Sequence, residues 1–212
     1  MQATRHKVFI SYHHTDHAYK EQLLHLNAEH SIFIDGSVTT GDISDDLPDQ
    51  TIRLKIRDEY LRDTTVTILL VGTQTRGRKH VDWELYSSMI DGQANKRSGI
   101  LALLLPGTNP GGYYTAGHEN EKAAVFPETT NWIAINSRIE YENRYPYLPD
   151  RIIDNLTSNN VRLSVVPWNK LTPTNLALLV DNAYKSRTSN QYDLSRPMRR
   201  HNAPAPNLAQ HV

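Results

Sequence analysis

Two nearly continuous apolar runs constrain the fold of this chain more than any other feature. They are "TVTILLVG" at residues 65–72 and "SGILALLLPG" at residues 98–107. Strands of a parallel sheet that helices cover on both faces are apolar at successive positions, whereas half-exposed strands alternate between apolar and polar residues. The two runs therefore predict central strands of a buried parallel sheet.

Strand-like and helix-like stretches alternate around these runs. Further strands are expected at residues 7–12 and 31–36, with shorter candidates at 131–136 and 161–166. Helical spacing of apolar residues is found after Asp16, from Ile52 to Tyr60, around Glu84 and after Thr172. This alternation predicts an α/β fold with a mostly parallel central sheet flanked by helices.

The second half of the chain is less regular than the first. We read residues 107–130 as a polar loop rich in glycine. Residues 1–190 are expected to form a single domain, because a chain of this length can bury one substantial core. Residues 191–212, which are rich in proline and polar side chains, are expected to form a flexible C-terminal tail.

Charge and composition exclude several classes of protein. The 212 residues include 23 basic and 23 acidic side chains, so the chain lacks the basic footprint of a nucleic-acid-binding protein. Its longest apolar runs are about half the length that crosses a bilayer. It contains no cysteine, which fits a reducing compartment. We expect a cytoplasmic protein with no nucleic-acid or membrane partner.

The candidate site follows from the expected sheet. In open α/β sheets, ligands bind beyond the carboxyl ends of the strands, where the strand order reverses. With a flavodoxin-like order, that point lies between the first and third strands. The polar residues that these two segments bring to one rim are Ser11, Tyr12, His13, Asp16, Thr73 and Glu84.

Glu84 is the most informative of these residues. Val81, Leu85 and Met89 form the buried stripe of the expected helix, so Glu84 lies about 100° away, at the margin of the core. A carboxylate there can face a cleft while staying ionised, aided by the helix N-terminus. The alternative is that Glu84 only complements the helix dipole. The neighbouring Trp83 has a similar alternative, since a lone tryptophan is more often packing than ligand stacking.

Metal chemistry is not indicated by the pattern. His13 and His14 are adjacent, so their side chains point in different directions, and no third ligand stands out. The acidic loop at residues 42–49 lacks the calcium-binding pattern of an EF-hand. We therefore expect no metal site.

The motifs "VFISYHHTD", "ILLVGTQTRGRKHVDWEL" and "GILALLLPG", in this order and spacing, resemble the TIR-like domains of the ThsB group. ThsB is the TIR subunit of the bacterial Thoeris antiphage system, and the resemblance covers roughly residues 6–187. It implies a flavodoxin-like, three-layer TIR fold. It also implies that Glu84 is the catalytic glutamate and that Phe9, Ser11 and His13 border an NAD⁺ pocket. Tyr12, Asp16, Thr73 and Trp83 are further candidates for substrate binding. The chain departs from the group in having His80 where several relatives have tryptophan, so that its nearest indole, Trp83, directly precedes Glu84.

The resemblance further implies a reaction and a biological setting. NAD⁺ would be the substrate, with no cofactor, and its cleavage would release nicotinamide and form an ADP-ribose-derived signal, often cyclic. That signal would activate an effector protein of the same defence system, and self-association would accompany activation. One ionised carboxylate suits this chemistry, because positive charge develops on the ribose while nicotinamide leaves without needing a proton.

Two other readings compete with the enzymatic one. The first is a non-catalytic TIR-like adaptor that associates through its helices and the loop at residues 37–50. The second is a receiver-like phosphoacceptor, which would need an aspartate at the end of the third strand. Gly72 and Thr73 stand there instead, which argues against it.

Overall fold

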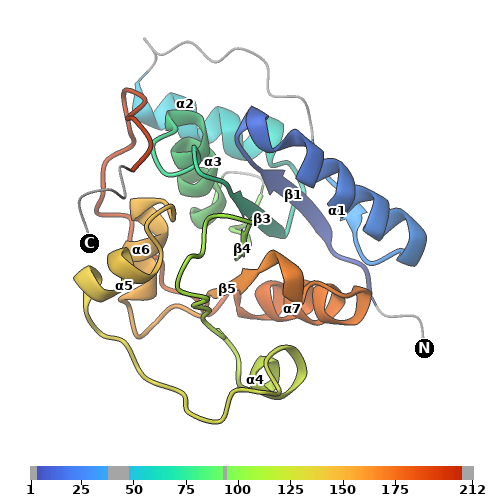
Figure 1. The fold of residues 1–212 in the computed structure, drawn as a ribbon. Helices are drawn as coiled ribbons and strands as arrows, with labels where there is room; N and C mark the ends of the chain where they lie inside the picture. The colour runs from blue at the N-terminus through green and yellow to red at the C-terminus, as the bar shows by residue number, and fades with distance from the viewer. Residues whose placement is uncertain (1–3, 38–47, 93–94, 207–212) are drawn as a thin grey trace.

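The computed structural model describes residues 4–37, 48–92 and 95–206. Its centre is a parallel sheet with the strand order β2-β1-β3-β4-β5 (Figure 1). The strands are β1 (Lys7–Ser11), β2 (Ile34–Asp35), β3 (Val66–Val71), β4 (Gly99–Leu104) and β5 (Ser164–Pro167). The order reverses between β1 and β3, which confirms the flavodoxin-like arrangement expected from the sequence.

The two apolar runs form the middle of the sheet. Every residue of β3 and of β4 is buried, and the strands pair from Val66 opposite Gly99 to Val71 opposite Leu104. Strand β1 lies on the other side of β3, with Ser11 opposite Leu69. The prediction of central strands covered on both faces is confirmed.

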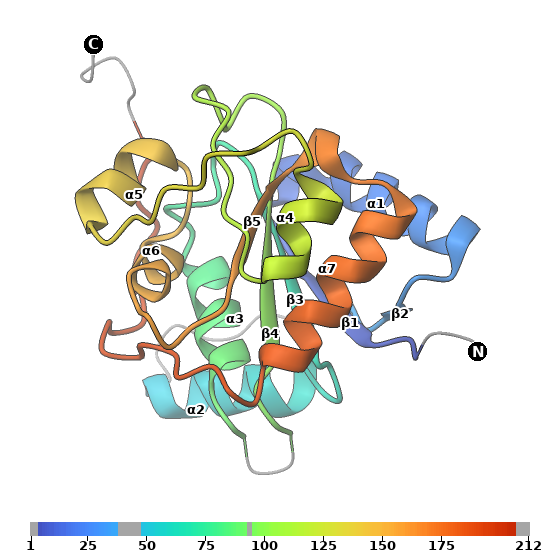
Figure 2. The same ribbon diagram turned by 90° about the horizontal axis from the view of Figure 1, so that it is seen from below.

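Helices cover both faces of the sheet, which gives the three-layer fold (Figure 2). One face packs against α1 (His17–His30), α4 (Glu119–Val125) and α7 (Pro173–Ser186). The other packs against α2 (Asp49–Lys55), which continues as a π-helical turn at Ile56–Tyr60, α3 (Lys79–Met89), α5 (Arg138–Arg144) and α6 (Asp150–Leu156). Short 3-10 turns at His14–Asp16 and Trp168–Lys170 complete the elements.

Strand alternation decides which side chains of β1 meet which layer. Successive residues of a strand point to opposite faces. Val8 and Ile10 lie in the core under α1 and α7, whereas Phe9 lies in the core beside α3 and Ser11 reaches a side chain of α3. The same rule places Thr67 and Leu69 of β3 on the α3 side.

The second half differs from the sequence reading in three places. Residues 131–136, one of the shorter strand candidates, form no strand. The segment read as a loop contains α4, and the chain beyond it contains α5 and α6, each only seven residues long. Such short helices show too few periods for their spacing to be recognised in a sequence.

The C-terminal segment also differs from the prediction. Tyr192 and Met198 are buried, and the guanidinium of Arg151 donates to the carbonyl oxygens of Arg196 and Pro197. The amide of Ala203 donates to the carbonyl oxygen of Gly77 at 2.8 Å. The expected flexible tail beginning at residue 191 is therefore wrong for the described part of that segment, which packs beside α3 and α6. Residues 207–212, and most of the loop at 37–50 with its acidic stretch, lie outside the described residues.

Candidate functional site

Ser11 and Glu84 form the centre of the candidate site. Ser11 is the last residue of β1, and Glu84 lies in the second turn of α3. The Ser11 hydroxyl donates a hydrogen bond of 2.7 Å to Oε2 of Glu84. The two residues are 73 positions apart, and the parallel pairing of β1 with β3 brings them together at the carboxyl end of the sheet, as the sequence predicted.

The environment of Glu84 differs from the one we expected. The side chain is only 9% exposed, and within the described residues it makes no ion pair. Burial raises the pKa of Glu84 to about 7, because it penalises the charged form, while the hydrogen bond from Ser11 acts in the opposite direction. The carboxyl group is therefore buried and holds its charge less readily than the ionised group that we expected at the core margin.

A second pair of hydroxyls supports the backbone below Glu84. Ser88, one turn further along α3, donates to the carbonyl oxygen of Glu84 at 2.8 Å. Its hydroxyl also lies 2.8 Å from that of Thr67 on β3. Sequence reasoning missed Thr67, although a threonine inside an otherwise aliphatic run was a visible signal. The pair ties the turn of α3 that carries Glu84 to the sheet.

His13 and Asp16 lie in the turn that follows β1. The imidazole of His13 accepts from the amide of Thr15 at 3.4 Å, which caps this turn. Burial lowers the pKa of His13, and the nearby charges of His14 and Arg78 lower it further. Arg78 directly precedes α3, and β1 pairs with β3, so this turn lies at the same end of the sheet as the start of α3.

Asp16 packs directly against the end of β3. A Cβ atom at Gly72 would lie 2.1 Å from Oδ2 of Asp16, so any other residue there would have to displace this carboxylate. That oxygen is buried without a hydrogen-bond partner among the described residues, and burial raises the pKa of Asp16. The structure therefore brings Asp16 to the same rim as Ser11, in agreement with the sequence reading.

Tyr12 and Thr73 are not part of the Ser11–Glu84 cluster. Tyr12 points to the other face of the sheet, where its hydroxyl lies 3.3 Å from Nδ1 of His17. Thr73 is exposed at the end of β3. The buried Thr75 instead holds this turn, by accepting from the amide of Gly72 at 2.9 Å.

Phe9 and Trp83 lie in the core beneath the site. Both are buried, at 3% and 1% exposure, in a cluster with Ile52, Ile56 and Met198. The indole nitrogen of Trp83 donates to the carbonyl oxygen of Arg199 at 2.8 Å. The packing alternative for Trp83 therefore fits the structure better than a role in stacking on a ligand.

Among the residues that the structure describes, His13 and His14 have no third metal-ligating side chain grouped with them. In the part of the chain that the structure describes, no set of three or more His, Asp or Glu side chains is arranged to hold a metal ion. Similarly, none of the described helices combines the length and the hydropathy that a membrane span requires.

A comparison with protein families identifies part of the chain. The family model for "Thoeris protein ThsB, TIR-like domain" matches residues 9–110, a range that runs from β1 past β4 and contains both Ser11 and Glu84. No curated protein matches the chain in sequence.

Proposed function

On the premise that residues 9–110 belong to the family of ThsB TIR-like domains, we propose that this chain is an NAD⁺-cleaving enzyme. The family gives the chain a context in Thoeris antiphage defence, with an effector partner. It breaks the bond between nicotinamide and ribose, and Glu84 is its catalytic carboxylate. The observation that carries the proposal is the hydrogen bond between Ser11 and Glu84 at the carboxyl end of β1. This is where an open parallel sheet presents its ligand site.

The reaction needs little besides a positioned negative charge. As the C–N bond breaks, its electron pair leaves with nicotinamide as a neutral molecule, so no general acid is required. Positive charge develops on the ribose ring, as in glycoside hydrolysis. An ionised Glu84 stabilises this charge electrostatically from a site that excludes water.

The raised pKa of Glu84 fits this role. A carboxyl group with a pKa of about 7 is held in a site that disfavours its charge. The cationic nicotinamide ring of the substrate, and the ribose cation that follows, supply the missing opposite charge. Ionisation of Glu84 is therefore favoured with substrate bound, and its charge is little screened by water. Ser11 keeps the carboxylate in position through its donated hydrogen bond.

The product is an ADP-ribose-derived signal, in cyclic form when the adenosine part of the same molecule reaches the anomeric carbon before water does. This signal activates the effector of the defence system, in the cytoplasm. We further expect the protein to associate with itself when it is activated, so the isolated chain at rest should turn over slowly.

A direct test compares the wild type with Glu84→Gln and Ser11→Ala. Each protein is incubated with NAD⁺ under activating conditions, nicotinamide is followed by chromatography, and the nucleotide product is identified by mass spectrometry. Glu84→Gln should reduce release by at least about 100-fold. The exposed Glu59 provides a matched control as Glu59→Gln, which should behave as the wild type. Equal release by the wild type and Glu84→Gln would overturn the proposal.

The burial of Phe9 and Trp83 favours a second candidate, a non-catalytic TIR-like adaptor. Neither ring offers an open face to a nicotinamide or adenine base, because both are almost fully buried. An adaptor would release no nicotinamide in any assembled state. The Glu84→Gln variant of an adaptor would also activate its partner as well as the wild type does.

A further inference from the structure

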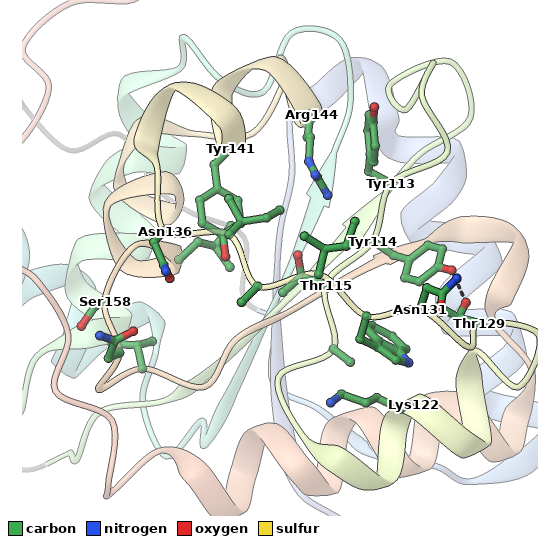
Figure 3. Close-up of a pocket in the computed structure, with 18 of the residues that line it drawn as sticks. Tyr113, Tyr114, Thr115, Lys122, Thr129, Asn131, Asn136, Tyr141, Arg144 and Ser158 are labelled. Carbon is green, nitrogen blue, oxygen red and sulfur yellow. Dashed lines mark hydrogen bonds between the residues drawn. The ribbon is translucent and has the colours of Figure 1, made fainter.

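A cavity of about 610 Å³ lies outside the part of the chain that matches the ThsB family. Its wall comes from residues 112–116, from α4 and α5, from the irregular segment at 131–136 and from residues 156–161 (Figure 3). It shares no residue with the cluster of Ser11 and Glu84. Its volume is within the range of small-molecule sites, about 300 to 1,000 Å³.

One side of this cavity is aromatic. Tyr113, Tyr114 and Trp132 line it, and the rings of Tyr114 and Trp132 meet edge to face with centroids 5.8 Å apart. Tyr114 also stacks on Phe126 at 4.1 Å, which fixes its orientation. Fixed rings of this kind offer flat apolar surface at little entropic cost when a ligand binds.

Cationic side chains accompany these rings. Lys122 of α4 lies 5.3 Å from the ring centre of Trp132, and Arg144 of α5 lies 4.8 Å from that of Tyr113. The described lining contains both cations and no carboxylate. Their acidic partners, Glu119 and Glu140, are neighbours on the same helices and are not part of the lining. The cavity therefore favours an anionic ligand.

Tyr141 adds an unused donor. Its side chain is 6% exposed, and its hydroxyl has no hydrogen-bond partner among the described residues. Figure 3 shows the side chain of Tyr141 extending from α5, with its hydroxyl directed toward the cavity. Burial raises the pKa of Tyr141, so the hydroxyl stays protonated and can donate. Because this hydroxyl is reached from the cavity, it can donate a hydrogen bond to an acceptor on a ligand.

We propose that this cavity binds a nucleotide. Its phosphate groups accept hydrogen bonds from Arg144, Lys122 and Tyr141, and its base lies against the aromatic side formed by Tyr113, Tyr114 and Trp132. Arginine suits this role because its planar fork of donors matches phosphate oxygens. The site is separate from the proposed NAD⁺-cleaving site, and its occupation does not require cleavage.

The test uses the full chain carrying Glu84→Gln, so that nucleotide chemistry at Glu84 does not interfere. Binding of ADP, GDP, CDP and UDP is measured by isothermal titration calorimetry. The same protein is then compared with added Lys122→Gln/Arg144→Gln, with added Tyr141→Phe, and with added Arg62→Gln. Arg62 is a matched control because its exposed guanidinium lies outside the cavity lining. Thermal unfolding of each variant shows whether it is folded.

The double substitution should weaken binding of the preferred nucleotide at least tenfold, while Arg62→Gln leaves it unchanged. Tyr141→Phe should weaken it several-fold without lowering the melting temperature, since the hydroxyl has no partner in the protein. Pyrophosphate should compete, and the corresponding nucleoside should bind at least tenfold more weakly. If none of the four nucleotides binds, or if the cavity variants bind as the parent does, the proposal is wrong. Either result leaves the assignment of Glu84 unaffected.

Discussion

The indole nitrogen of Trp83 donates to the carbonyl oxygen of Arg199, which joins α3 to the C-terminal segment across 116 positions of the chain. Trp83 directly precedes Glu84, and its ring is almost fully buried. The bond therefore fixes the turn of α3 that carries the candidate catalytic carboxylate. In this view the tryptophan supports the site from behind, while Glu84 faces the end of β1.

The first prediction concerns this support. Trp83→Phe removes the hydrogen bond to Arg199 and leaves a small cavity, so the free energy of unfolding should fall by about 2 kcal/mol. Urea denaturation measures this loss. Trp132→Phe, at a half-buried ring outside the sheet core, is the control and should change stability much less. A stable Trp83→Phe protein that nevertheless fails to release nicotinamide would show that the indole acts on the substrate instead.

The second prediction is a pH dependence of stability. Because the pKa of Glu84 is raised to about 7 in the folded state, folding favours the protonated carboxyl group. Its contribution to stability is fully present below about pH 4.5 and is lost as the pH rises through 7, to a limit of about 3 kcal/mol. Glu84→Gln does not titrate there, so its stability relative to the wild type should increase from pH 4.5 to 8. Urea titrations of both proteins at each pH measure this. A difference in the free energy of unfolding that stays constant from pH 4.5 to 8 would contradict the raised pKa of Glu84.

The third prediction follows from the hydrogen bond of Ser11. The Ser11 hydroxyl favours the ionised form of Glu84, so Ser11→Ala should raise its pKa further and shift the pH profile of nicotinamide release to higher pH. Hydrogen bonds to charged groups contribute about 1.5 to 3 kcal/mol. Release at pH 6 should therefore fall roughly tenfold, and it should recover in part at pH 9. Ser88→Ala removes bonds to the backbone of Glu84 and to Thr67 but none to the Glu84 carboxylate, so it is the control and should leave the profile in place. If the pH profile of Ser11→Ala matches that of the wild type, Ser11 does not influence the ionisation of Glu84.

The fourth prediction concerns the buried ion pair that anchors the C-terminal segment. Arg151 is fully buried and donates to both carboxylate oxygens of Asp82, at 2.8 and 3.0 Å. Arg151→Met leaves Asp82 charged and unpaired, which should cost about 3 to 5 kcal/mol of stability. Limited proteolysis should then cleave the chain near Arg196 and Pro197, whose carbonyl oxygens lose their donor.

A double variant provides the control for this pair. Arg151→Met/Asp82→Leu removes both charges and should recover part of the lost stability, because an apolar pair of similar volume can replace a buried ion pair. A loss below about 1 kcal/mol in the single variant would mean that water or another cation compensates Asp82.

The sequence by itself determined the central strands of the sheet and, with the flavodoxin-like strand order, the rim that Ser11 and Glu84 share. The apolar runs of β3 and β4 predict buried parallel strands. The spacing of Val81, Leu85 and Met89 predicts which face of α3 packs against the core. These signals are local, because each depends on residues within a few turns or pleats of one another. Once the strand order is known, the carboxyl ends of β1 and β3 must lie side by side. Ser11, the last residue of β1, is then placed at that end of the sheet.

Only the tertiary structure decided the surroundings of these residues. The near-neutral pKa of Glu84 depends on burial by several elements, and the role of Trp83 depends on Arg199, far along the chain. The cavity beside Tyr141 is formed by short helices and irregular segments, which carry no periodic signal. Burial and long-range hydrogen bonds are properties of the packed chain, so residue types and spacing alone do not specify them.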